Sequence, residues 1–102
     1  SELLANVERQ SAALRAALIR LGAEFGVFTN VRGRGLMLGA VLADAYKGRA
    51  GEVLDIAANH GLLLLQAGPD VLRLVPPLNI TDEELADGLA RLHTALQAFA
   101  AK

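Results

Sequence analysis

The sequence predicts an α+β domain in which helices cover one face of a small, mostly antiparallel sheet. Two observations predict this class. Apolar residues recur at helical spacing near both ends of the chain, and the strand-like runs between them come in two hairpin-like pairs. Paired runs of this kind form antiparallel sheets, whereas a parallel sheet needs strands that alternate with helices. The expected order along the chain is α-β-β-α-β-β-α.

The first element is a helix from about residue 2 to 24. Ser1 is available as its N-cap, and charged residues lie off the apolar stripe. The stripe consists of Leu3, Val7, Leu14, Leu18 and Leu21.

A hairpin is expected next, from two runs rich in β-branched and apolar residues. Val27–Val31 and Leu36–Leu42 are the strands, and Arg32–Gly35 is the glycine-bearing turn between them. A polar connection follows, and a second helix begins near Arg49. Gly61 is well placed as the left-handed residue that closes this helix.

The second hairpin and the last helix complete the domain. We expect a short buried strand over Leu62–Gln66, a turn over Ala67–Asp70 and a return strand over Val71–Val75, which Pro76-Pro77 stops. Thr81 and Glu84 have the spacing of a capping box, so a helix should begin there and run to about residue 101.

Composition excludes several classes of function. The chain has 102 residues, 53% of them hydrophobic, a formal net charge of −1 and no cysteine. One domain is the natural size, and the absence of a basic cluster excludes nucleic acid as an expected partner. No apolar run approaches the ~20 residues of a membrane span, and no secretory signal opens the chain. We therefore expect a cytoplasmic protein with no membrane partner.

Most reactive residues have a structural interpretation. His60 and His93 lack a second ligand at metal-binding spacing, and the acidic residues 82–84 begin a capped helix. Gly33, Gly35 and Gly39 superficially resemble a phosphate-binding loop. They separate two strands rather than a strand and a helix, so a tight connection is the better interpretation.

Arg73 is the one candidate binding residue. Strand alternation places it on the same face as Val71 and Val75, and an unpaired guanidinium is costly to bury. Spacing alone slightly favours an internal ion pair with Asp or Glu. The alternative is a bidentate clamp on a substrate carboxylate.

Three runs in a fixed order carry a family resemblance: Val31–Gly39, Tyr46–Ala50 and Ala67–Leu78. They contain the patterns R-G-x-G-L-x-x-G, Y-K-G-R-A and A-G-x-x-x-x-R-x-x-P-x-L. Over nearly its whole length the chain resembles the C-terminal small domain of class III pyridoxal-phosphate aminotransferases. The Y-K-G-R-A segment is most similar to the acetylornithine branch.

The resemblance implies a reaction and a role for Arg73. The branch moves the δ-amino group of N-acetylornithine to 2-oxoglutarate in arginine biosynthesis, and the matching arginine grips a substrate carboxylate. The complete enzyme is expected to be a homodimer that uses pyridoxal phosphate.

Residues 1–102 are expected to form this one domain without the large cofactor-binding domain. The only lysines, Lys47 and Lys102, lie in settings that do not favour imine formation. We therefore expect the chain alone to bind no cofactor and to be inactive, and to self-associate through surface that the large domain would cover.

Two other functions stay open on the residues alone. One is a free-standing amino-acid-binding module, and the other is an interaction domain in which Arg73 makes an internal salt bridge. Catalysis is expected of neither.

Overall fold

The computed structural model describes residues 1–101 and has the predicted α+β architecture. Three α-helices and a four-stranded antiparallel sheet follow the predicted order, with one added 3-10 turn. The elements are α1 (Glu2–Phe25), β1 (Phe28–Arg34), β2 (Met37–Leu42), η1 (Asp44–Tyr46), α2 (Ala50–Asn59), β3 (Leu65–Gln66), β4 (Val71–Leu74) and α3 (Asp82–Ala100). Lys102 lies outside the described residues.

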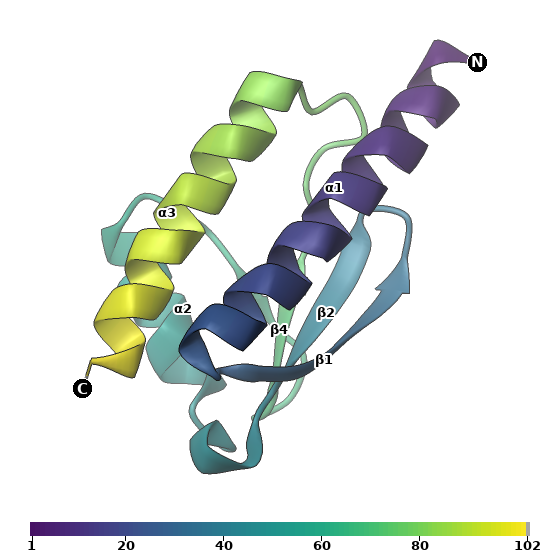
Figure 1. The fold of residues 1–102 in the computed structure, drawn as a ribbon. Helices are drawn as coiled ribbons and strands as arrows, with labels where there is room; N and C mark the ends of the chain where they lie inside the picture. Colours follow the sequence, from purple (N-terminus) through teal and green to yellow (C-terminus); the bar gives the residue numbers. More distant parts are fainter. Residues whose placement is uncertain (102) are drawn as a thin grey trace.

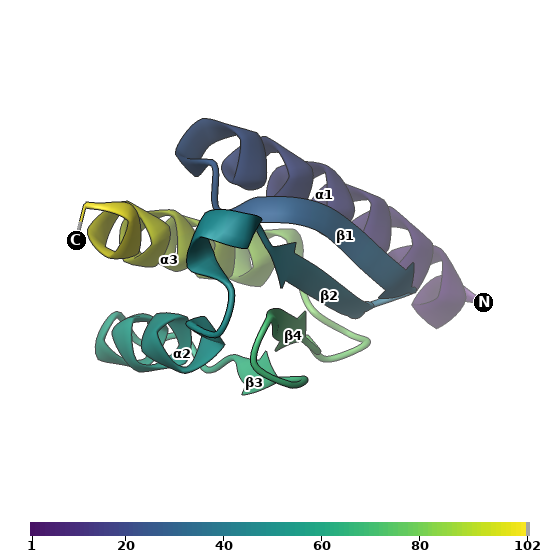
Figure 2. The same ribbon diagram turned by 90° about the horizontal axis from the view of Figure 1, so that it is seen from below.

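The helices lie on one side of the sheet, whose strand order is β1-β2-β4-β3. α1 and α3 lie side by side over the sheet, and α2 packs against α3 beside β3 and β4 (Figures 1 and 2). Alternate residues of β2, namely Leu38, Ala40 and Leu42, are fully buried against the helices. Because side chains alternate along a strand, the residues between them face the opposite side, where Met37 is 61% exposed and Val71 of β4 is 9% exposed. We call this side the outer face.

The predicted helix ends are confirmed. The Leu4 amide donates to the Ser1 hydroxyl at the start of α1, and Gly61 has the left-handed φ of 79° after α2. Thr81 and Glu84 form both hydrogen bonds of a capping box at the start of α3. These signals are local, so the sequence is sufficient to locate them.

The sheet differs from the prediction in two places. β1 continues to Arg34, so Arg32 and Gly33 lie in the ladder instead of the turn. Gly33 has a φ of 120°, and a Cβ there would overlap the Met37 carbonyl oxygen, so glycine is what allows the strand to continue. The predicted buried strand over 62–66 is correct only in part: Leu65–Gln66 pairs with β4, but both residues are exposed because this edge has no neighbouring strand.

Candidate functional site

Arg73 lies in the middle of β4, on the outer face of the sheet. In the ladder it is directly opposite Gly39 of β2 on one side and Leu65 of β3 on the other. Its neighbours Leu72 and Leu74 face the helices, and Leu72 is fully buried. The predicted alternation is therefore confirmed, and the exposed Arg73 side chain lies on the outer face.

Arg73 has no ion pair or hydrogen bond with any side chain among residues 1–101, and it is exposed. The internal ion pair favoured by spacing alone is therefore wrong. Arg73 lacks an ion pair because the strands of the sheet contribute no carboxylate to the outer face. The residues that alternation places there are Asn30, Arg32, Arg34, Met37, Gly39, Val41, Leu65, Val71 and Arg73.

The turn before β4 is fixed by the segment between η1 and α2. Asp70 accepts a 2.6 Å hydrogen bond from the Gly48 amide through its carboxylate, and its carbonyl accepts from the Leu42 amide at 2.8 Å. The Ala50 amide donates to the Pro69 carbonyl at 3.2 Å. These bonds lock the β3–β4 hairpin onto β2, and so they set the position of Arg73.

Arg49 explains the second motif, Tyr46–Ala50. Its guanidinium lies 4.7 Å from the ring centroid of Phe99 and 5.6 Å from that of Tyr46, and it forms two hydrogen bonds with Glu52 at 2.6 and 3.0 Å. The hydrogen bond with Glu52 raises the pKa of Arg49 above its ordinary value. This side chain joins η1 and α2 to the end of α3, so its role is to hold the segment that anchors Asp70.

Side chains of α1 hold the far ends of the sheet, a set of contacts that the periodicity does not reveal. Arg15 donates to the carbonyls of Val31 and Gly33 at 3.1 and 2.6 Å. Gln10, only 2% exposed, donates to the Ile80 carbonyl and to Asp82. The chain is thereby fixed both at the β1–β2 turn and after β4.

The remaining candidates have structural partners. His93 lies 3.0 Å from Glu24 on the surface, and the His60 amide caps α2. Within residues 1–101 no group of three His, Asp or Glu side chains could hold a metal ion. No described helix is long and apolar enough to cross a membrane.

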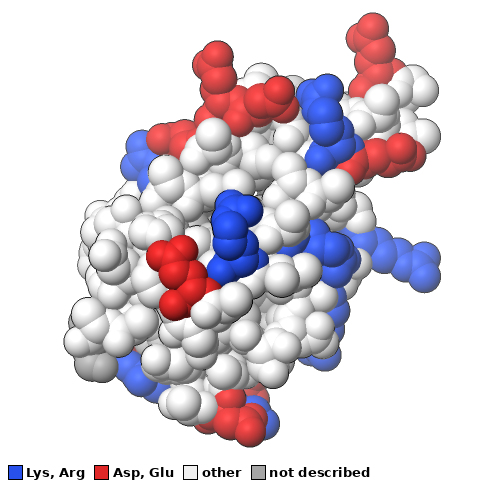
Figure 3. All heavy atoms as spheres, viewed as in Figure 1, with Lys and Arg blue, Asp and Glu red and all other residues white. Residues whose placement is uncertain are grey.

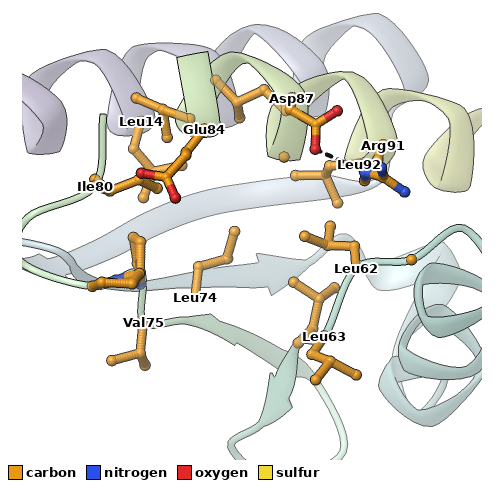
Figure 4. A pocket seen from close by; sticks show the side chains of 17 residues that line it. Leu14, Leu62, Leu63, Leu74, Val75, Ile80, Glu84, Asp87, Arg91 and Leu92 are labelled. Atoms are coloured by element: carbon orange, nitrogen blue, oxygen red, sulfur yellow. Dashed lines mark hydrogen bonds and ion pairs between the residues drawn. The ribbon is translucent and has the colours of Figure 1, made fainter. Parts of the chain in front are cut away.

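An apolar groove of about 330 Å³ lies on the helix side of β4, between α3 and the segments 61–64 and 74–80. Leu62, Leu74 and Leu92 point into it, and the Asp87–Arg91 ion pair lies at its rim (Figure 4). Arg73 does not line this groove, because it faces the other side of the strand. The groove and the candidate arginine are thus separate features. On the surface above the helices, acidic side chains gather where α3 begins (Figure 3).

Comparison with known proteins identifies the family. The model of the family described as aminotransferase class-III matches residues 1–96. The chain belongs to the class III aminotransferases. The resemblance carried by the three motif runs is therefore confirmed.

Close relatives within the family share one name. The acetylornithine aminotransferase of Xanthomonas campestris pv. campestris is 69% identical over 101 residues, and that of Neisseria meningitidis serogroup B is 49% identical over 100. The crystal structure of N-acetylornithine aminotransferase from Stenotrophomonas maltophilia K279a has a TM-score of 0.96 at 65% identity and covers 99% of this chain. The chain spans about a quarter of the length of these relatives, 25% for the first and 28% for the solved structure.

Class III aminotransferases use pyridoxal phosphate, but the described residues do not form a site for it. An imine-forming lysine is favoured by a buried or apolar setting that lowers its pKa. Lys47 is exposed over 57% of its side chain and pairs with Asp44 at 3.2 Å, and neither described pocket includes it. Lys47 therefore does not have the setting of an imine-forming lysine.

Proposed function

We propose that this chain is the C-terminal small domain of an enzyme that moves the δ-amino group of N-acetylornithine to 2-oxoglutarate in arginine biosynthesis. The names of the close relatives support this substrate, since they are 69% and 49% identical over almost the whole chain. In such an enzyme, pyridoxal phosphate bound outside this chain would supply the electron sink for the transfer. The enzyme is proposed to be a cytoplasmic homodimer.

Arg73 is the residue by which this domain would take part. One observation carries the assignment: an exposed guanidinium in the middle of the sheet has no carboxylate partner among residues 1–101. A guanidinium is always charged, and its planar fork matches a carboxylate through two parallel hydrogen bonds. Arg73 would therefore bind a carboxylate of the amino acid or 2-oxo acid and hold it in a fixed orientation.

Orientation is the contribution that this geometry can make to the reaction. The fixed hairpin holds the Arg73 backbone, so a bound carboxylate is fixed relative to the sheet. A substrate held in this way reacts faster because the loss of its rotational freedom accompanies binding and not the chemical step. The proton and amino-group transfers themselves would be carried out by residues of the large domain.

The test is the kinetics of Arg73→Ala in the full-length enzyme. A lost bidentate pair should lower kcat/KM for N-acetylornithine and 2-oxoglutarate by roughly 10- to 100-fold, or about 1.5–3 kcal/mol. Arg34→Ala is the matched control, because Arg34 lies on the same face but opposite Met37 at the sheet's far end. Unchanged kinetics for Arg73→Ala would leave this arginine with no substrate role.

Residues 1–102 alone should be inactive and should bind no pyridoxal phosphate. After the chain is mixed with the cofactor and reduced with borohydride, mass spectrometry should detect no pyridoxyl adduct on Lys47. Tight calorimetric binding of 2-oxoglutarate or N-acetylornithine by the chain alone would instead favour a free-standing binding module.

A further inference from the structure

Gly39 is the residue directly opposite Arg73 in the central pair of strands, β2 and β4. Its own backbone does not require glycine, because its φ lies outside the left-handed region, unlike that of Gly33 or Gly35. A glycine inside a strand weakens it, by roughly 0.5–1 kcal/mol relative to alanine. In such a position glycine often marks a site where a ligand or another backbone approaches closely.

Because Gly39 has no side chain, only main chain lies between Arg73 and Arg32 in this row of the outer face. A Cβ at position 39 would stand 3.2 Å from Cγ1 of Val71 and 3.8 Å from the Leu72 carbonyl oxygen. The first distance is tight but the contact is with a side chain, so alanine is sterically difficult rather than forbidden. Any larger side chain would extend outward from the sheet, next to the guanidinium of Arg73.

The charges on both sides of this space favour an anion. Across the sheet the row runs Leu65, Arg73, Gly39 and Arg32. Adjacent strands are about 4.8 Å apart, so Arg32 and Arg73 flank Gly39 at about one strand spacing each. Neither arginine has an ion pair among residues 1–101. A carboxylate bound at this row would therefore lie between two guanidinium groups, over the backbone of Gly39.

We propose that Gly39 is a specificity-determining residue: its missing side chain provides the space in which the carboxylate-bearing end of the substrate lies while Arg73 binds it. The inference rests on the proposed function of Arg73. It extends that function by assigning the size limit of the carboxylate site to position 39. An added side chain there fills the space that the ligand needs and leaves the cation itself in place.

The experiment compares Gly39→Ala and Gly39→Val in the full-length holoenzyme. One extra carbon in a fitted site changes discrimination by roughly 10- to 200-fold, so Gly39→Ala should raise KM for 2-oxoglutarate about tenfold, and Gly39→Val more. Val41→Leu is the control, since it adds one carbon to the same face of β2, two residues away. Because Val41 pairs with Val71 and not with Arg73, this change at a half-buried position should keep KM within about twofold of the parent. The proposal predicts that kcat at saturation falls much less than kcat/KM.

A second comparison separates lost space from a displaced strand. In Gly39→Ala/Val71→Ala the contact with Val71 is relieved, so a KM defect that came only from strand displacement would disappear. A filled ligand space predicts that the double variant keeps the raised KM. If Gly39→Val does not fold, Gly39→Ala and the double variant decide the question.

Failure of this inference is distinguishable from failure of the proposed function. If Arg73→Ala raises KM and both Gly39 variants have the parent's KM, position 39 has no role and the function of Arg73 stands. If Arg73→Ala leaves KM unchanged, the carboxylate site itself is refuted, and the proposal for Gly39 with it.

Discussion

Gln10 offers a stringent test of how the fold holds the end of the Arg73 strand. It is the one polar side chain among the described residues that is buried, at 2% exposed, and it reaches from α1 to the segment between β4 and α3. Its amide nitrogen donates to the Ile80 carbonyl at 3.2 Å and to the Asp82 carboxylate at 2.7 Å. Gln10→Met keeps the shape of the side chain and removes both bonds.

The magnitude follows from what each acceptor loses. Asp82 is mostly exposed and can turn to water, and the Ile80 carbonyl keeps a hydrogen bond from Asn6 at 3.2 Å. The neutral bond is worth about 1 kcal/mol and the bond to the carboxylate somewhat more, so the free energy of unfolding should fall by about 2 kcal/mol. For a domain of this size that lowers Tm by roughly 8–16 °C.

The assay is urea unfolding of residues 1–102, with Glu8→Gln as the exposed control on the same helix. Gln10→Glu should destabilise more than Gln10→Met at pH 7, because it buries a carboxylate beside Asp82. That excess should shrink as the pH falls and the new group is protonated. A loss below about 0.5 kcal/mol for Gln10→Met would refute the reasoning, since exposed substitutions cause changes of that size.

Three further predictions concern the same chain. The capping-box hydrogen bonds from Thr81 lower the pKa of Glu84 below its ordinary 4.5, so the contribution of Glu84 to stability is present above pH 4.5 and is lost as the pH falls through the lowered pKa. In chemical unfolding, the difference in free energy of unfolding between the parent and Glu84→Gln should therefore shrink from pH 7 to pH 3, and a difference independent of pH would contradict this. Gly33→Ala should lower Tm far more than Gly48→Ala, because both glycines have positive φ but only at position 33 would the added Cβ overlap a backbone carbonyl. Equal losses of Tm in thermal melting would be inconsistent with the β1–β2 pairing. The isolated chain should sediment as dimers or larger species, because Met37, Leu63 and Leu65 are 61%, 88% and 57% exposed, whereas a monodisperse monomer would show that this surface does not associate.

Local signals in the sequence were sufficient for the helices and for the orientation of β4. The Thr81–Glu84 capping box and Gly61 depend on neighbours three or four residues away, and alternation alone placed Arg73 and Leu72 on different faces of the sheet. The motif runs were sufficient for the family, which the match over residues 1–96 confirms.

Contacts between distant segments could not be predicted. Gln10 and Ile80 are 70 residues apart, and Arg15 reaches the carbonyls of Val31 and Gly33 across the α1–β1 connection. The apolar composition of residues 62–66 predicted a buried strand, but composition does not reveal whether a strand has a neighbour on each side, and here one edge has none. The isolation of Arg73 from carboxylates likewise depends on strand order, which no local pattern specifies.

The central claim is that Arg73 binds a substrate carboxylate, and a crystal structure of the full-length enzyme with bound 2-oxoglutarate tests it most directly. We predict that two guanidinium nitrogens of Arg73 lie within about 3.2 Å of the oxygens of one ligand carboxylate, with that carboxylate beside Gly39. A structure in which Arg73 pairs with a protein carboxylate, and the ligand is bound elsewhere, would contradict the claim.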